Sequence, residues 1–380
     1  MQTKMSLLAA AIIAIFAGTA QAEDLIVKIG HVAPTSGNQA HLGKDNELGA
    51  KMAIEELNAK GVKIGGKTAR FELLAEDDAA DPKQGTAAAQ KLVDAKVNGV
   101  IGHLNSGTTI PASKIYADAG IPQISPSATN PDYTHNGYKT AFRVVANDIH
   151  LGSTLGKYAV KELKGKAIAV VDDRSAYGEG VAKQFEKAVK ESGGTVVGHV
   201  FTNDKATDFS PILTSLKGKK PDIIFFGGMD AVAGPMLRQM KSLGITAKFM
   251  GGDGICTANL PKLSSGSIAD SQVVCAEAGG VDSGGKVAMD KFKADFKQKY
   301  GVEVQIYAPY VYDAVKVMAA AMEKAGSAEP AKYLPVLAKM EGYKGVTGTI
   351  GFDSFGDIKN GSLTLYTYKS GQREQLAVVH

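Results

Sequence analysis

Short apolar runs and amphipathic segments alternate along the first third of the chain, which has 380 residues. Apolar runs of about four to eight residues are typical of buried strands, whereas apolar residues spaced three and four apart predict helices. The predicted strands are 25–32, 69–75, 97–101 and 123–125, and the predicted helices are 49–60, 110–119 and one that begins at Asp81-Pro82. This alternation predicts a parallel sheet with helices on both faces.

The same alternation starts again after residue 165. Strands are predicted at 167–171, 195–200, 221–226 and 248–250, and helices at 180–192 and 231–243. Residues 97–120 and 222–244 share one order of strand, glycine-containing polar turn and helix. We interpret this order as a structural pseudo-repeat, which predicts two lobes of similar design.

The last hundred residues add two helices, predicted at 287–300 and 310–324, and two strands, predicted at 348–352 and 363–369. We predict that these helices return to the first lobe and that the last strands join the second. The predicted fold is therefore α/β, with two doubly wound lobes, parallel-rich sheets and a hinge of three chain segments.

Residues 1–22 have the three parts of a secretory signal peptide. Lys4 supplies the positive charge, residues 7–17 are apolar, and Ala20-Gln21-Ala22 fits a cleavage site. The alternative is a membrane anchor, but the apolar run is shorter than the ~20 residues that span a bilayer. We expect cleavage after Ala22 and export of the mature chain.

Composition excludes several other classes of protein. The chain has 43 Lys and Arg against 39 Asp and Glu, a net charge of +4, without a block of five like charges. A nucleic-acid-binding tail or a polybasic membrane patch is therefore not expected. Cys256 and Cys275 form an even pair that is consistent with a disulfide in an exported protein, and two free buried thiols are the alternative.

Residues Gly61–Thr68 match the P-loop pattern G-x-x-x-x-G-K-[ST], but they follow a predicted helix and precede a predicted strand. A phosphate loop needs the opposite order, so we interpret them as a helix end and a turn. The seven histidines lack metal-ligand spacing, and we find no nucleophile motif. We expect neither catalysis nor a metal or cofactor.

Polar turns at the ends of predicted strands are the better signal, because ligands of open α/β sheets bind beyond those ends. The turn at residues 103–109 contains Ser106 and precedes a helix, whose free N–H groups suit a carboxylate. Hydroxyls follow the next strand at residues 127–130. In the second lobe, Asp253 lies between glycines that would let a ligand approach closely, and Tyr177 lies at a strand-to-helix turn. Hydroxyls facing a carboxylate and an aromatic ring suit a zwitterion such as an α-amino acid.

At these residues the chain resembles the periplasmic branched-chain amino-acid-binding proteins of ABC importers, which have the type I periplasmic-binding, or Venus-flytrap, fold. The resemblance covers residues 23–380, and its motifs occur in the family's order. The stretches that carry it are Thr35–Gly37, Asp77–Gln84, Val100–Leu104, Pro126–Thr129, Tyr177–Gly180, Phe226–Gly228 and Phe249–Gly251.

The resemblance implies roles for single residues. Ser106 and Thr129 resemble the hydroxyls that hold the ligand carboxylate, and Ser127 would add backbone groups that, with Thr129, also meet the ammonium. Tyr177 matches the tyrosine that closes over the ligand. Asp253 stands where leucine-binding members commonly have Glu, the counter-ion of the ammonium. The remaining predicted site residues are Leu104, Asn105 and Ala128 beside these groups, and Leu42, Met229 and Tyr307 in the side-chain pocket.

Departures from the family pattern concern the side-chain pocket most. Leu42 and Met229 occupy positions that resemble tyrosines of close leucine binders. Familiar members have a cysteine pair where this chain has Ala80 and Asn105, so Cys256 and Cys275 would form a different bridge. The resemblance therefore implies a retained α-amino-acid site with a rebuilt pocket for the side chain.

The expected protein is a periplasmic, monomeric solute-binding protein that delivers leucine, isoleucine or valine to an ABC permease in the inner membrane. Lobe 1 is predicted at 23–145 and 279–351, and lobe 2 at 146–278 and 352–380. The alternatives are the same fold binding another amino acid, an amide, urea or an aromatic acid, and a sensory co-receptor.

Overall fold

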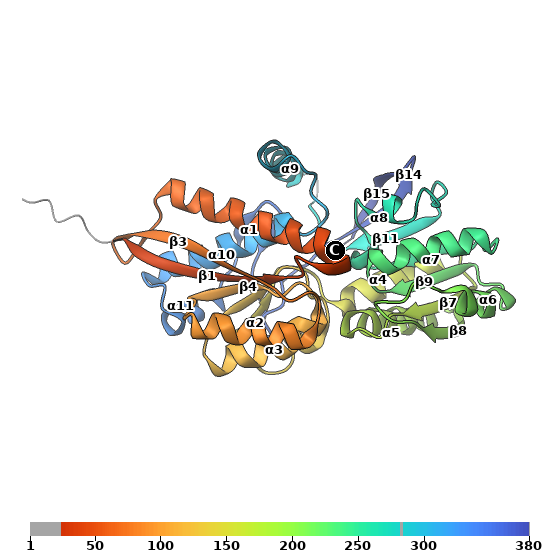
Figure 1. Ribbon diagram of the computed structural model, residues 1–380, viewed down its shortest axis with the longest axis horizontal. Helices are drawn as coiled ribbons and strands as arrows, with labels where there is room; N and C mark the ends of the chain where they lie inside the picture. The colour runs from red at the N-terminus through yellow and green to blue at the C-terminus, as the bar shows by residue number, and fades with distance from the viewer. Residues whose placement is uncertain (1–23, 282–283, 380) are drawn as a thin grey trace, which may run out of the picture.

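The computed structural model describes residues 24–281 and 284–379, so the predicted signal peptide lies outside the described residues. Two α/β lobes lie side by side along the long axis of the molecule (Figure 1). Each lobe is built on its own sheet, one of six strands and one of seven. The prediction of two lobes with parallel-rich sheets is confirmed.

Lobe 1 contains the six-stranded sheet, with strand order β2-β3-β1-β4-β5-β6 and only the β2–β3 pair antiparallel. The helices α9, α10 and α11 return to this lobe from the end of the chain, as predicted for the first two (Figure 1). The elements are β1 (Leu25–Ala33), η1 (Gly37–Gln39), α1 (Ala40–Lys60), β2 (Lys63–Ile64), β3 (Lys67–Asp77), α2 (Pro82–Asp94), β4 (Gly99–Gly102), α3 (Ser106–Asp118), β5 (Gln123–Ser125), η2 (Pro131–Tyr133), β6 (Ala141–Arg143), α9 (Lys286–Tyr300), α10 (Ala308–Ala325) and α11 (Pro330–Leu337).

Lobe 2 contains the seven-stranded sheet, with strand order β15-β14-β11-β10-β9-β7-β8. Its central strands are parallel and buried along nearly their whole length, which explains their continuous apolar runs. The elements are α4 (Asp148–Lys161), β7 (Ala167–Asp172), α5 (Ala176–Glu191), β8 (Thr195–Phe201), α6 (Ser210–Gly218), β9 (Ile223–Gly227), α7 (Asp230–Ser242), β10 (Lys248–Gly251), η3 (Asp253–Ile255), α8 (Leu260–Leu263), β11 (Val273–Glu277), β14 (Leu363–Lys369) and β15 (Gln372–Val379). A separate hairpin is formed by β12 (Tyr343–Gly345) and β13 (Gly348–Ile350).

The P-loop-like residues form no phosphate loop. Gly61 ends α1 in the left-handed conformation, with φ of 64°, and β2 and β3 then form an antiparallel hairpin around Gly65 and Gly66. A left-handed glycine at this position is a common helix end. The interpretation as a helix end and a turn is confirmed.

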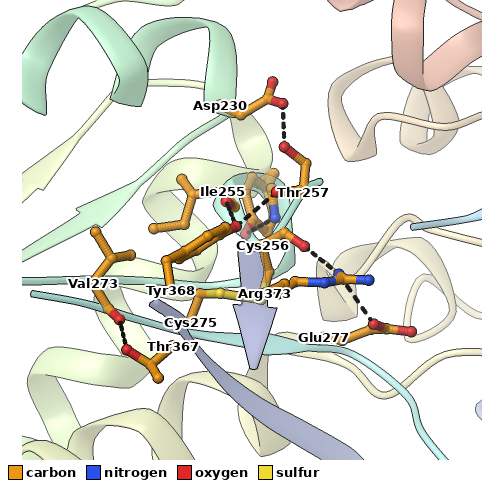
Figure 2. Close-up of a disulfide and its surroundings, with 12 residues drawn as sticks. Asp230, Ile255, Cys256, Thr257, Val273, Cys275, Glu277, Thr367, Tyr368 and Arg373 are labelled. Atoms are coloured by element: carbon orange, nitrogen blue, oxygen red, sulfur yellow. Dashed lines mark hydrogen bonds and ion pairs between the residues drawn. A yellow bond between two sulfur atoms is a disulfide. The ribbon is translucent and has the colours of Figure 1, made fainter. Parts of the chain in front are cut away.

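A disulfide joins Cys256, directly after η3, to Cys275 in β11, with the two Cα atoms 5.3 Å apart (Figure 2). Both cysteines are buried. Side chains of the last two strands hold the same segment: Arg373 Nη1 donates to the Cys256 carbonyl (2.5 Å), and the Tyr368 hydroxyl donates to the Thr257 carbonyl (2.7 Å). The cross-link therefore attaches residues 253–257, which we call the Asp253 segment, to the sheet of lobe 2.

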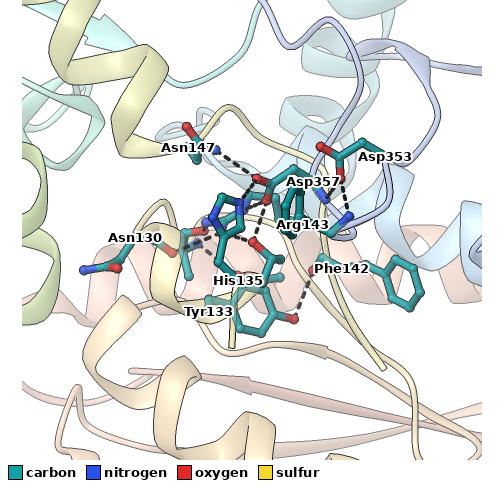
Figure 3. A network of polar contacts seen from close by, with 12 residues as sticks. Asn130, Tyr133, His135, Phe142, Arg143, Asn147, Asp353 and Asp357 are labelled. Atoms are coloured by element: carbon teal, nitrogen blue, oxygen red, sulfur yellow. Dashed lines mark hydrogen bonds and ion pairs between the residues drawn. The ribbon is translucent and has the colours of Figure 1, made fainter. Parts of the chain in front are cut away.

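The chain passes between the lobes after β6, after β11 and after β13. Arg143, the last residue of β6, is fully buried at the first crossing. Its Nε lies 2.5 Å from Oδ1 of Asp357, which belongs to the third crossing (Figure 3). The Asn147 amide, which follows Arg143 at the first crossing and caps α4 of lobe 2, donates to the other oxygen of Asp357 (2.9 Å).

The Arg143 guanidinium also holds the loop after β5. It donates to the carbonyls of Ala128 (2.6 Å) and Asn130 (3.0 Å), on either side of Thr129. Burial raises the pKa of Asp357, but the Arg143 charge and three hydrogen-bond donors outweigh it and hold that pKa below its usual range. Asp357 is therefore a charged partner, and the pair fixes the loop relative to the crossings.

Replacing Arg143→Met should lower the free energy of unfolding by about 3–5 kcal/mol, because it removes the guanidinium from a buried ion pair and leaves Asp357 with only the donors Thr134, Asn147 and His135. Urea unfolding at pH 7 measures this change. Arg238→Met is the matched control, since Arg238 is exposed and should change stability by less than about 1 kcal/mol. Equal effects of the two substitutions would show that the buried pair has no special role.

Candidate functional site

Two turns at the carboxyl ends of neighbouring strands in lobe 1 bring the predicted hydroxyls together. β4 and β5 are adjacent and parallel, so residues 103–106 and 126–130 meet at one edge of the sheet. The Ser127 hydroxyl donates to the Leu104 carbonyl (3.0 Å), and the Ser106 hydroxyl accepts from the Asn130 N–H (3.2 Å). These contacts link both turns into one surface.

The helix after β4 begins earlier than the predicted 110–119, because α3 begins at Ser106. The Thr108 and Thr109 hydroxyls donate to the Asn105 carbonyl (3.1 and 2.8 Å) and support an extra turn. The sequence placed the start at Pro111 because proline favours the first turn, whereas Pro111 lies inside the helix. Asn105 is the N-cap residue, but its side chain does not cap the helix, so the N-terminus of α3 keeps uncapped N–H groups and a partial positive charge.

Asp253 lies in lobe 2, two residues after β10, and only 1% of its surface is exposed. Its Oδ2 accepts from the Tyr307 hydroxyl (3.0 Å), which comes from the start of α10 in lobe 1. Its Oδ1 is buried without a hydrogen-bond partner. Burial raises the pKa of Asp253 to about 6, against the opposing effect of the Tyr177 and Tyr307 hydroxyls.

The glycines beside Asp253 make room for Tyr177 and not only for a ligand. A Cβ on Gly252 would lie 2.5 Å from the Tyr177 hydroxyl, and a Cβ on Gly254 would lie 2.8 Å from the ring. The Gly254 N–H donates to that hydroxyl (3.1 Å). Tyr177, in the first turn of α5, therefore packs directly on the Asp253 segment.

A narrow cavity lies between these groups, with residues of both lobes in its wall. Eight of the predicted site residues line it: Leu104, Asn105, Ser106, Ser127, Tyr177, Met229, Asp253 and Tyr307. The other three are buried but do not line it. Leu42 packs in the apolar core from the first turn of α1, while Ala128 and Thr129 lie in the loop that Arg143 holds.

Asp148 is a candidate site residue that the sequence reasoning missed. It is the first residue of α4 and fully buried, and its N–H donates to the Thr129 carbonyl (2.8 Å). Burial, helped by the Asp253 charge, raises its pKa to about 8, against the opposing effect of the Thr129 hydroxyl. The available signal was Asn147-Asp148 before apolar residues at helical spacing, a helix start that we did not identify.

The polar atoms of the site divide into two kinds. Buried oxygens without partners belong to Asp253 and Asn105, which both line the cavity. The uncapped N-terminus of α3 supplies N–H donors and a partial positive charge. A small molecule with one cationic donor and one anionic acceptor would satisfy both kinds.

A wider depression lies at the chain crossings, lined by residues 144–146, 278–281 and 358–362 among others. The charged side chains Lys359 and Glu341 in its wall pair with each other (3.2 Å), and Tyr310 pairs with Glu277 (2.7 Å). It lacks the convergent unpaired groups of the smaller cavity, which is therefore the candidate site.

Within residues 24–281 and 284–379 no helix is both long and apolar enough to cross a membrane. The same residues contain no group of three or more His, Cys, Asp or Glu side chains that could hold a metal ion.

The model of a family described as periplasmic binding protein matches residues 26–373. A leucine-, isoleucine-, valine-, threonine- and alanine-binding protein of Pseudomonas aeruginosa is 37% identical over 362 residues, 95% of each chain. Among solved structures, a leucine-binding protein of Thermotoga maritima has a TM-score of 0.85 at 27% identity, covering 93% of this chain and 99% of that one. A branched-chain amino-acid transporter substrate-binding protein of Streptococcus pneumoniae, in complex with isoleucine, has a TM-score of 0.83 at 28% identity with the same coverage. The chain belongs to the periplasmic binding protein family.

Proposed function

We propose that this protein binds a branched-chain α-amino acid between its lobes. The observation that supports it most is the buried Asp253 carboxylate, with one unpartnered oxygen, in the wall of a cavity that the start of α3 also lines. A buried charge without a partner is unfavourable, and an ammonium group supplies that partner. The names of the Pseudomonas relative and of the Streptococcus complex support the class of ligand.

In this proposal the ligand carboxylate lies at the N-terminus of α3 with the Ser106 and Thr129 hydroxyls, and the Ser127 backbone lies beside it. Asp253 pairs with the ammonium, and Tyr177 covers the ligand from lobe 2. Met229, Tyr307 and Leu104 surround the apolar side chain, and Leu42 packs in the apolar core without lining the cavity. Apolar groups of this kind suit an aliphatic side chain, because they offer burial without polar partners.

Membership of the periplasmic binding protein family supports the rest of the proposal. The mature chain acts as a monomer in the periplasm, has no enzymatic activity, and delivers its ligand to an ABC permease of the inner membrane. The two lobes, with boundaries 23–145 plus 279–351 and 146–278 plus 352–380, close around the ligand by bending at the crossings.

A thermal-shift panel on ligand-stripped protein tests the class of ligand. We expect leucine, isoleucine and valine at millimolar concentration to stabilise the protein by ~4 kcal/mol if Kd is micromolar. The panel contains the twenty amino acids together with amides, urea and aromatic acids. A shift confined to a ligand without an ammonium group would contradict the proposal.

Asp253→Asn should weaken leucine binding at pH 7 by at least about tenfold, because the amide loses the charge that pairs with the ammonium. Isothermal titration of ligand-stripped protein measures this effect. Unchanged affinity would remove Asp253 from the ammonium site, and a parallel loss of ligand-free stability would point to a folding defect instead.

The same carboxylate predicts a pH dependence. The pKa of Asp253 is about 6 without ligand, and a bound ammonium would lower it, so binding below pH 6 must release a proton. Affinity should therefore be constant above this value and fall about tenfold from pH 7 to pH 5. Asp148, with a pKa of about 8, stays mostly protonated in this window. Asp253→Asn is the control and should abolish the dependence.

A further inference from the structure

A histidine and an aspartate from opposite lobes meet outside the candidate cavity. His41 lies in the first turn of α1 in lobe 1, and Asp230 is the first residue of α7 in lobe 2. His41 Nε2 lies 2.8 Å from Oδ2 of Asp230. The Asp230 side chain is fully buried, whereas the His41 side chain is 22% exposed. Neither residue lines the cavity.

Contacts within lobe 2 hold the Asp230 side chain independently of His41. The Thr257 hydroxyl donates to the same Oδ2 (2.6 Å), and Thr257 belongs to the Asp253 segment that the disulfide attaches to β11 (Figure 2). The carboxylate also lies at the N-terminus of α7, where the helix dipole stabilises a negative charge. Lobe 2 thus presents a prepared acceptor, and its second oxygen, Oδ1, has no partner.

The position of the two residues connects them to the ligand. Asp230 follows Met229, which lines the cavity, whereas His41 precedes Leu42, which packs in the apolar core. The segment that carries Thr257 also carries Asp253. Because His41 and Asp230 come from different lobes, their contact depends on the relative position of the two lobes that form the cavity.

We propose that His41 and Asp230 are positioning residues that form a closure pair: they meet when the lobes close, and they raise ligand affinity without touching the ligand. The proposal rests on the proposed function, because it assumes a protein that closes around a solute. A contact made only in the closed state increases the closed fraction, and apparent affinity increases with that fraction. Its loss should mainly speed ligand dissociation, because release requires opening.

A double-mutant cycle tests the pair. Ligand-stripped wild type, His41→Ala, Asp230→Asn and the double variant are titrated with L-leucine, and dissociation is followed by stopped flow. We expect His41→Ala to weaken binding about tenfold, as for one charge-assisted hydrogen bond, through faster dissociation with nearly unchanged association. The double variant should lose no more than the larger single effect.

His199→Ala is the matched control. His199 Nε2 lies 2.7 Å from Oδ2 of Asp172, so the contact has the same chemistry, but both residues belong to lobe 2. This substitution should leave the Kd for leucine unchanged. Thermal unfolding without ligand distinguishes a purely structural contact from the proposed positioning contact. The loss of a purely structural contact lowers Tm and leaves Kd unchanged.

Two results would overturn the proposal: single variants that bind within twofold of wild type, or effects that multiply in the double variant. If Asp230→Asn does not fold, the affinity of the His41→Ala variant still tests the proposal, because His41 is partly exposed. His199→Ala remains its control. If wild type does not bind leucine, isoleucine or valine, the proposed function fails. The cycle is then run with the ligand from the thermal-shift panel that gives the largest shift, so the two failures remain distinct.

Discussion

Burial of the Asp253 carboxylate between two lobes is the constraint on which the rest of the site depends. Its pKa of about 6 shows that the surroundings disfavour the charge, although two tyrosine hydroxyls partly offset the effect of burial. Asp148 lies in the same buried region, where burial and the Asp253 charge raise its pKa to about 8, so it stays mostly uncharged at pH 7. A site of this kind favours a ligand that brings a positive charge, because only such a ligand removes the cost of the buried, unpaired carboxylate. Selectivity for an ammonium group is thus set by the groups that the protein leaves unpaired.

Arg143 shows the opposite solution to the same problem. This guanidinium is as deeply buried as Asp253, but Asp357, the Thr134 hydroxyl and two backbone carbonyls satisfy it. A buried charged group whose hydrogen bonds are all made fixes the local geometry. A buried charged group that lacks a partner favours binding of a ligand that supplies one. The two carbonyls flank Thr129. The Arg143 guanidinium at the crossings therefore holds the loop after β5, and Asp253 lies across the cavity from this loop. The groups that Arg143 holds in place and the Asp253 carboxylate therefore both lie between the two lobes.

The sequence predicted most strands because buried parallel strands carry continuous apolar runs, as in β7 and β9. It missed α4 and β15 and placed the start of α1 too late. Asp45, in the missed part of α1, is buried because it accepts hydrogen bonds from the N–H groups of residues 305–308, a distant partner that local periodicity cannot reveal. Strand-end turns meet at one edge of a parallel sheet through topology alone, so eight predicted site residues line one cavity. The helix start at Asn147 was a local signal for Asp148 that the sequence reasoning did not use. The contact between His41 and Asp230 was not predictable, because contacts between lobes depend on how far the crossings bend.

The difference between groups held by hydrogen bonds and groups free to adapt also explains which part of the site sets the ligand preference. Backbone groups and hydroxyls around α3 and the β5 loop are held by several hydrogen bonds, so the part of the site that we propose for the carboxylate is well fixed. The proposed side-chain pocket instead contains Met229, a flexible residue that adapts to different apolar shapes. Leucine, isoleucine and valine differ by single methyl or methylene groups, which a hydrophobic pocket distinguishes by only about 1–3 kcal/mol. For a pocket with a flexible wall, we expect differences in binding free energy in the lower part of that range. Recognition is then strict for the ammonium and the carboxylate and tolerant for the aliphatic side chain, because the protein is rigid at the charges and adaptable beyond them.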